Sequence, residues 1–298
     1  MKPQIQAKLL EIRAKRSFNP EDWVNKKCEM LNEYMRRAGL KGVVVNVSGG
    51  IDSAVTIMLA DKASKMPGSP IVKVYGIIQP IHSTPAIMKR AVDFLEASKL
   101  EYTVIDQSDV FDLLDKKVVE CMKVPSSKFA SGQLKSYMRT PVAYYAAQIF
   151  SNNGIPSLVI GTGNFDEDGY LYYFCKPGDG TSDIQLIHDL HKSEVNSVAR
   201  FIGVSDAICV APPSADLWEG QTDENELGFS YAFCELYVHL IQDKEAMLQW
   251  EASLDEDAKA QWKAISEKIE RTHRRNNHKE KWPINLDICC PVGEQFKF

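Results

Sequence analysis

The stretch LKGVVVNVSGGIDS, residues 40–53, contains the change of pattern that decides the fold. Its first half holds four valines, at positions 43, 44, 45 and 47. A short, nearly continuous β-branched run of this kind is typical of a strand buried on both faces of a parallel sheet. Two glycines follow, and residues 51–65 then have helical spacing. The order strand, Gly-rich turn, helix is the first unit of a β-then-α repeat.

The same alternation extends on both sides of this stretch. Residues 20–38 place apolar side chains at helical spacing. Downstream, the pattern predicts strands at 71–79, 102–106 and 157–160, helices at 85–98, 110–122 and 134–151, and a loop at 124–132. We therefore expect an α/β fold with a doubly wound, mostly parallel sheet and helices on both faces. We also expect a single domain over 1–298, whose helical C-terminal part spans about 223–298.

Composition excludes several classes of protein. The 298 residues carry a formal net charge of -5, which argues against a nucleic-acid binder that depends on electrostatics. No apolar run approaches the roughly 20 residues of a membrane span, and the N-terminus has no apolar signal region. The seven cysteines show no CxxC spacing, so a zinc ribbon is poorly supported. A cytoplasmic protein without nucleic-acid or membrane partners is the expectation.

The motif Ser48-Gly-Gly-Ile-Asp-Ser53 carries the chemistry. Its glycines allow close approach of the backbone to an anion, and the following helix directs N–H groups and its dipole at the same point. Asp52 beside a phosphate implies a divalent cation between the two anions. The alternative is a tight turn that happens to be rich in Ser and Gly. Because ligands bind beyond the carboxyl ends of parallel strands, residues 48–53 and 161–167 should share one rim of the sheet.

SGGIDS resembles the pyrophosphate-binding loop of the N-type ATP pyrophosphatases. Within that group, three further stretches resemble ammonia-dependent NAD synthetase: GTGNFDEDGYLYYFCKPGDGTSDIQLIHDLHKSEV (161–195), APPSADLWEGQTDENELGFSY (211–231) and NNHKEKWP (276–283). The resemblance implies ATP-dependent amidation of deamido-NAD, which is nicotinic acid adenine dinucleotide, by ammonia. An acyl adenylate would be the intermediate, and NAD, AMP and pyrophosphate the products.

The resemblance also implies roles for individual residues. The ATP contacts would be Asn46, Val47, Ser48, Gly49, Gly50, Ile51, Asp52, Ser53, Thr162, Lys192 and Ser214. Asp52 and Glu167 would hold Mg²⁺. The contacts to deamido-NAD would be Arg139, Lys176, Asp179, Asp183, His278 and Lys279, the last two on a loop that closes over the substrate. Asp52, Glu167, Lys192 and Asp179 form the expected catalytic set, in which Asp179 would take a proton from ammonia.

By residue pattern alone, some of these residues have simpler interpretations. Glu167 fits a solvated loop acid, Lys192 a surface lysine, and Ser214 a turn serine.

Three departures from the family pattern fall on the substrate side. Tyr137 stands where the family has the first of two arginines, Phe165-Asp166 replaces a basic residue and a serine, and Glu280 replaces an arginine. The length favours free ammonia over an attached amidase domain, and the resemblance implies a homodimer. Two rivals stay open at this point. One is another adenylating ATP pyrophosphatase that acts on a different carboxylate or on tRNA, and the other is a non-catalytic nucleotide sensor.

Overall fold

The computed structural model describes residues 1–214, 216–217, 220 and 222–281. The chain divides into two compact units. The larger contains Phe18–Phe165 and Cys175–Glu226, and the smaller contains Met1–Ser17, Asp166–Phe174 and the chain from Leu227 onward. That all of it acts as a single domain stays a prediction. Within the described residues no helix is long and apolar enough to cross a membrane.

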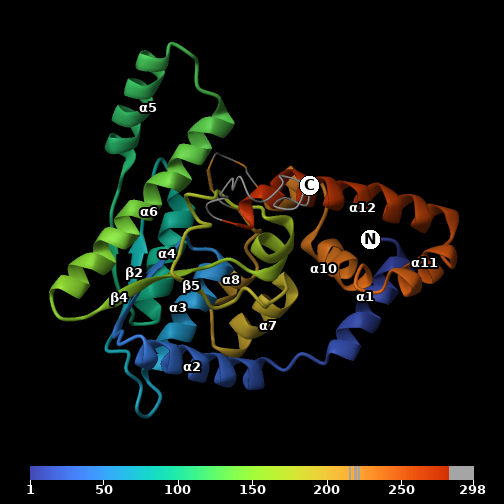
Figure 1. The fold of residues 1–298 in the computed structure, drawn as a ribbon, viewed down its shortest axis with the longest axis horizontal. Helices are drawn as coiled ribbons and strands as arrows, with labels where there is room; N and C mark the ends of the chain where they lie inside the picture. Colours follow the sequence, from blue (N-terminus) through green and yellow to red (C-terminus); the bar gives the residue numbers. More distant parts are fainter. Residues whose placement is uncertain (215, 218–219, 221, 282–298) are drawn as a thin grey trace, which may run out of the picture. The chain divides into compact units, whose positions relative to one another are not determined.

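A five-stranded sheet organises the larger unit (Figure 1). All its pairings are parallel, so the predicted doubly wound α/β class is confirmed. The spatial order is β3-β2-β1-β4-β5. The chain runs outward from β1 through β2 to β3 and then crosses to the other side of β1, where it forms β4. The strand order therefore reverses between β1 and β4, which makes this the switch point of the sheet. The bounds are β1 (Gly42–Asn46), β2 (Lys73–Ile78), β3 (Glu101–Val104), β4 (Ser157–Gly161) and β5 (Ile184–Gln185).

Helices cover both faces of this sheet because the strand side chains alternate. Val43 and Val45 of β1 pack into a core with helices α2, α3 and α7, whereas Val44 packs against Ala143 and Ala147 of α6 on the opposite face. All three valines are fully buried. The helices of this unit are α2 (Pro20–Arg37), α3 (Ile51–Ser64), α4 (Pro85–Ala97), α5 (Ser108–Met122), α6 (Lys128–Asn152), α7 (Lys192–Phe201), α8 (Asp206–Cys209) and α9 (Asp223–Leu227).

The smaller unit is helical. The Arg13 guanidinium donates to the buried Glu235 carboxylate at 2.6 Å, and the rings of Phe233 and Trp262 stack at 5.5 Å. The predicted helical character of the C-terminal part is confirmed for its described residues, whereas the participation of the N-terminal helix was not foreseen. The elements are α1 (Pro3–Arg16), α10 (Tyr231–Leu240), α11 (Lys244–Ala252), α12 (Glu256–Asn276) and the 3-10 turn η2 (Asn277–Lys279), together with most of the π-helical turn η1 (Phe165–Leu171).

One local expectation was wrong, and one strand was missed. The predicted loop at 124–132 is helical from Lys128, because the Ser127 hydroxyl accepts a hydrogen bond from the Ala130 N–H and caps α6. The sequence analysis also missed β5, which has only two residues. A strand this short carries no periodic signal, and it forms through pairing with β4.

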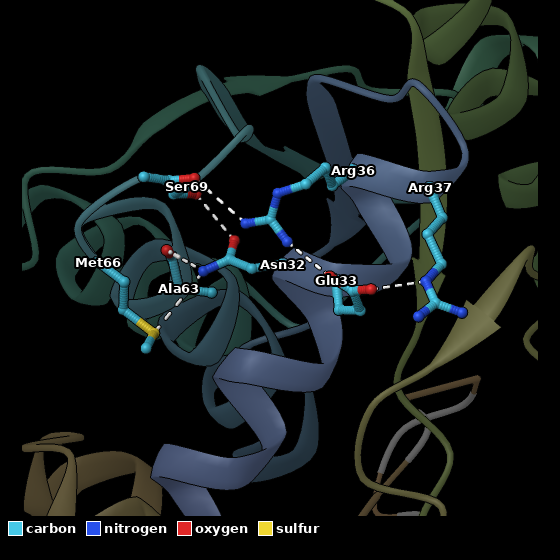
Figure 2. Close-up of polar contacts among 8 residues, drawn as sticks. Asn32, Glu33, Arg36, Arg37, Ala63, Met66 and Ser69 are labelled. Atoms are coloured by element: carbon cyan, nitrogen blue, oxygen red, sulfur yellow. Dashed lines mark hydrogen bonds and ion pairs between the residues drawn. The ribbon is translucent and has the colours of Figure 1, made fainter.

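Asn32 joins α2 to the segment that leads into β2 (Figure 2). Its side chain is buried, donates to the Ala63 carbonyl at 2.9 Å and accepts from the Ser69 hydroxyl at 2.8 Å. In the same view, Arg37 contacts only Glu33, and 80% of its side chain is exposed. The buried Asn32 amide therefore links the two segments, whereas the neighbouring Arg37–Glu33 ion pair lies on the surface and contributes little to stability.

We expect Asn32→Ala to lower the free energy of unfolding by about 1–3 kcal/mol, because it removes the side-chain hydrogen bonds to the Ala63 carbonyl and from the Ser69 hydroxyl. Arg37→Ala, the control on the same helix, should change it by less than about 0.5 kcal/mol. Urea denaturation measures both values. Equal losses for the two variants would contradict the distinction.

Candidate nucleotide-binding site

The Gly-rich loop between β1 and α3 is closed by its own two serines. The Ser53 hydroxyl accepts from the Ser48 N–H at 3.2 Å and donates to the Gly50 carbonyl at 3.0 Å. The Ser48 hydroxyl accepts from the Gly50 N–H at 3.2 Å. Gly49 has φ +81°, a left-handed conformation that favours glycine. The serines therefore shape the loop, and the first turn of α3 presents backbone N–H groups of the kind that can bind an anion.

Helix α4 supports this loop from outside. The Arg90 Nε donates to the Gly49 carbonyl at 2.7 Å. A Cβ placed on Gly49 would lie 2.8 Å from the carbonyl oxygen of Ile87, so α4 packs directly on the glycine. The sequence analysis missed Arg90, because an arginine on a predicted helix has the pattern of an ordinary surface residue. No sequence signal identified it.

A buried ion pair lies at the start of α3. The Lys192 ammonium donates to Asp52 Oδ2 at 2.6 Å, and the Asn164 amide donates to Asp52 Oδ1 at 3.0 Å. Lys192 is 7% exposed and Asn164 is fully buried. The three residues come from α7, the turn after β4, and α3. Lys192 is therefore not the surface lysine of the simpler interpretation. Residues 48–53 and the turn after β4 share one rim of the sheet as far as Phe165, as predicted.

Two further predicted ATP contacts, Thr162 and Ser214, lie on separate segments of the larger unit. Thr162 directly follows β4 and is half-buried. The Ser214 hydroxyl accepts from the Asp216 N–H at 3.1 Å. The Asp216 carboxylate accepts from the N–H and the hydroxyl of Thr84 at 3.0 and 2.8 Å. Asp216 thereby attaches the segment of Ser214 to the beginning of α4.

A row of amides lines the carboxyl ends of β1 and β2. Asn46 Oδ1 accepts from Gln79 Nε2 at 2.6 Å, and Gln79 Oε1 accepts from Gln107 Nε2 at 2.7 Å. Arg139 of α6 joins the row through its Nε, which donates to the Gln79 carbonyl at 3.3 Å. Burial lowers the pKa of the Arg139 guanidinium, although arginine stays protonated in proteins. The row fixes Arg139 beside the predicted ATP contact Asn46.

Asp179 contacts α6, the helix that also carries Arg139. Its Oδ1 accepts from the Ser136 hydroxyl at 3.0 Å and from the Cys175 N–H at 2.9 Å. The Asp179 side chain is exposed to solvent. Lys176 lies three residues earlier, and burial lowers the pKa of its ammonium. Ser136, which the sequence analysis did not select, holds Asp179 in place.

Asp183 is held by the sheet. Its Oδ2 accepts from the Val159 N–H of β4 at 2.7 Å, and its Oδ1 accepts from the Tyr144 hydroxyl at 3.4 Å. Burial, together with this carboxylate, raises the pKa of the Tyr144 hydroxyl to about 12. These contacts give Asp183 a role in attaching β5 to β4 in addition to its predicted substrate contact.

Two of the three departures place aromatic rings where the family has cations. The Tyr137 hydroxyl donates to Gln133 Oε1 at 3.1 Å, and burial raises its pKa, with a smaller contribution from Asp179. The Phe165 ring contacts the ring of His191 edge-on at 5.1 Å, and His191 is the N-cap residue that directly precedes α7. Positions 137 and 165 of the larger unit therefore carry rings in place of the positive charges that the resemblance predicts there.

Three predicted residues, Glu167, His278 and Lys279, belong to the smaller unit. Glu167 lies in η1 and is half-buried. The His278 Nδ1 contacts the Arg275 carbonyl at 3.1 Å within the end of α12. Lys279 Nζ donates to the carbonyls of Tyr172 and Phe174 at 3.1 and 2.7 Å. Lys279 is thus engaged with main chain of its own unit.

The chemistry of Asp52 fits a magnesium ligand. It is a carboxylate at the N-terminal turn of a helix, held in one orientation by Lys192 and Asn164. Among the described residues no group of three or more His, Cys, Asp or Glu side chains is arranged to hold a metal. Mg²⁺ at nucleotide sites needs no such group, because phosphate oxygens and waters supply most of its ligands.

A parallel sheet with a phosphate-type loop at its switch point, flanked by a buried acid–lysine pair, defines a nucleotide-binding α/β protein. Comparison with known proteins refines this class. The NAD synthase family model matches residues 23–283, and the chain belongs to this family.

Curated relatives agree with this assignment. The chain is 34% identical over 270 residues to the NH(3)-dependent NAD(+) synthetase of Alkaliphilus oremlandii, covering 87% of this chain and 94% of the relative. It is 34% identical over 267 residues to the enzyme of the same name from Methanosarcina mazei, with 88% and 96% covered. A solved NMN synthetase from Francisella tularensis superposes with a TM-score of 0.73 at 27% identity, covering 91% of this chain and all of that one.

We expect the charges of Lys192 and Asp52 to stabilise the larger unit jointly, so that each charge contributes only when the other is present. Asp52→Asn and Lys192→Met should each lower the free energy of unfolding by about 2–4 kcal/mol, because each leaves a largely buried charge without its counter-charge. The double variant should lose at least about 1 kcal/mol less than the sum of the two. Denaturant titration of the four proteins measures this coupling. Strict additivity would contradict the pairing.

Proposed function

We propose that this chain is an ammonia-dependent NAD synthetase that converts deamido-NAD, ATP and ammonia to NAD, AMP and pyrophosphate. The proposal is supported most directly by 34% identity across 94% of the Alkaliphilus oremlandii enzyme. The Gly-rich loop and the Lys192–Asp52 pair supply the nucleotide chemistry that this reaction requires. The cytoplasmic location expected from the sequence stays a prediction.

The reaction requires activation because a carboxylate resists nucleophiles. Its charge is delocalised and its leaving group is poor. The nicotinate carboxylate therefore attacks the α-phosphorus of ATP, and ammonia then displaces AMP from the acyl adenylate. The loop N–H groups and Lys192 would stabilise the charge that develops on the departing pyrophosphate. Mg²⁺, for which Asp52 and Glu167 are the proposed protein ligands, would neutralise phosphate oxygens when bound. Asp179, exposed and held by Ser136, would accept the proton that ammonia releases.

A second candidate substrate is nicotinic acid mononucleotide, whose amidation by the same chemistry yields NMN. The likeness to an NMN synthetase at 27% identity favours it. So does the loss of positive charge on the substrate side. A dinucleotide brings two phosphates and a mononucleotide one, so fewer cations suffice for the smaller acid. Tyr137 and Phe165 are the two positions in the larger unit where rings replace those cations.

Mass spectrometry of the purified protein with ATP, Mg²⁺ and ammonium tests both substrates. We expect pyrophosphate release to require deamido-NAD or the mononucleotide, with equal amounts of AMP and amide formed. Tyr137→Arg should raise kcat/KM for deamido-NAD relative to the mononucleotide by about tenfold, the effect of one added charge-assisted hydrogen bond.

Asp52→Asn is the negative control and should form no amide. Pyrophosphate release that depends on tRNA would favour the rival adenylating enzyme. ATP binding without turnover of any substrate would favour the sensor.

We propose that the protein is a homodimer joined through α5. Val110, Leu114 and Val118 are 56%, 38% and 43% exposed and recur every four residues, so they form one apolar stripe along the helix. A twofold interface buries the same surface from both copies, which makes a self-complementary apolar stripe a suitable contact. An exposed stripe of this length is otherwise unfavourable in water.

Val118→Asp should convert the dimer to a monomer in sedimentation velocity, because it buries an unpaired charge in the interface. Lys116→Asp, on the opposite face of the same helix, should leave the dimer intact. A monomeric wild-type protein, or a Val118→Asp dimer, would contradict the proposed interface.

A further inference from the structure

One face of the C-terminal helix contacts the main chain of the acidic turn. His273 and Asn276 of α12 and Lys279 of η2 occur at intervals of three residues, so they share a face. The His273 Nδ1 donates to a carbonyl at 2.7 Å, the Asn276 amide at 3.1 Å, and the Lys279 ammonium to two carbonyls at 3.1 and 2.7 Å. In chain order the accepting carbonyls are those of Tyr170, Leu171, Tyr172 and Phe174.

These carbonyls belong to the place where η1 ends. Tyr172 has φ +49°, which ends the helical turn, and the Tyr173 N–H returns to the Glu167 carbonyl at 2.9 Å. The last carbonyls of any helical turn have no partner inside it. Leu171 is fully buried, so its carbonyl requires a donor from elsewhere in the protein. The three side chains of α12 and η2 supply these donors.

Helix α12 also contacts the side chain of Tyr170 in this turn. The Tyr170 ring stacks on the His273 ring at 4.5 Å with an interplanar angle of 14°. The hydroxyls of Tyr170 and Tyr237 both donate to Glu270 Oε1, at 3.0 and 2.6 Å. Glu270 precedes His273 by three residues and continues the same face of α12. Four consecutive positions of one helical face are thus committed to fixing a single turn.

We propose that His273 and Asn276 are positioning residues for Glu167, the acid that lies within the turn they hold. This inference rests on the proposed function, in which Glu167 is a magnesium ligand. A carboxylate that binds the same metal ion as the nucleotide phosphates needs a fixed orientation. The residues that hydrogen-bond to a metal ligand, or to the segment that carries it, set the orientation of that ligand. By the same argument, Lys279 stabilises the turn through its hydrogen bonds to two carbonyls, in addition to its predicted contact to substrate.

Matched variants separate hydrogen bonding from packing. Asn276→Ala removes one donor. His273→Phe keeps the stacked ring but removes the Nδ1 donor, whereas His273→Asn keeps a donor near the Nδ1 position and removes the stacking. Lys263→Ala, at an exposed position of the same helix, is the control. Two measurements are made on each intact protein: amide hydrogen exchange, and the affinity for Mn²⁺ in the presence of α,β-methylene-ATP.

Asn276→Ala and His273→Phe should accelerate exchange across 166–174 while β1 stays protected, and should weaken Mn²⁺ binding by roughly tenfold. His273→Asn should restore most of the Mn²⁺ affinity lost in His273→Phe, and Lys263→Ala should match the wild type. Wild-type Mn²⁺ affinity in the two donor-deficient variants would overturn the positioning role and leave the proposed function intact. A wild-type protein that binds no Mn²⁺ with the nucleotide analogue would overturn the proposed metal ligands, and this inference with them.

Discussion

The larger unit depends on one buried interaction, the pair between the Lys192 ammonium and the Asp52 carboxylate. The pair joins the beginning of α3 to the beginning of α7, and Asn164 adds the turn after β4. Three elements that are far apart in sequence are thereby fixed at the carboxyl edge of the sheet. The Lys192 and Asp52 side chains are only 9% and 18% exposed, so removing either charge leaves its partner largely buried without a counter-charge, which is costly. The site and the stability of its surroundings are therefore linked.

The sequence analysis identified the features that repeat or that concentrate unusual residues. The valine run predicted a strand buried on both faces, and Val43, Val44 and Val45 are indeed fully buried between two layers of helices. The two glycines predicted the loop, and Gly49 adopts a left-handed backbone conformation that favours glycine at this position. Both features follow from local conformational preferences, which a single sequence displays directly.

The features that the sequence analysis missed depend on contacts between distant residues. Nothing local distinguishes Arg90 from a surface arginine, yet it holds the Gly49 carbonyl. Nothing local marks Asn276 either, yet it reaches Leu171 more than one hundred residues earlier in the chain. The two-residue strand β5 exists only through its pairing with β4. Such features are set by tertiary packing, which overrides or adds to local preference.

In the proposed reaction, one oxygen of the nicotinate carboxylate becomes bonded to the α-phosphorus of ATP, and ammonia then displaces this oxygen as part of AMP. Oxygen labelling of the substrate tests it most directly. Deamido-NAD or the mononucleotide, with ¹⁸O at both carboxylate oxygens, is incubated with the protein, ATP, Mg²⁺ and ammonium. The masses of the products are then measured by mass spectrometry. We expect AMP that contains one ¹⁸O, an amide that retains the other ¹⁸O, and unlabelled pyrophosphate. Label in pyrophosphate, or AMP without label, would contradict the proposed reaction.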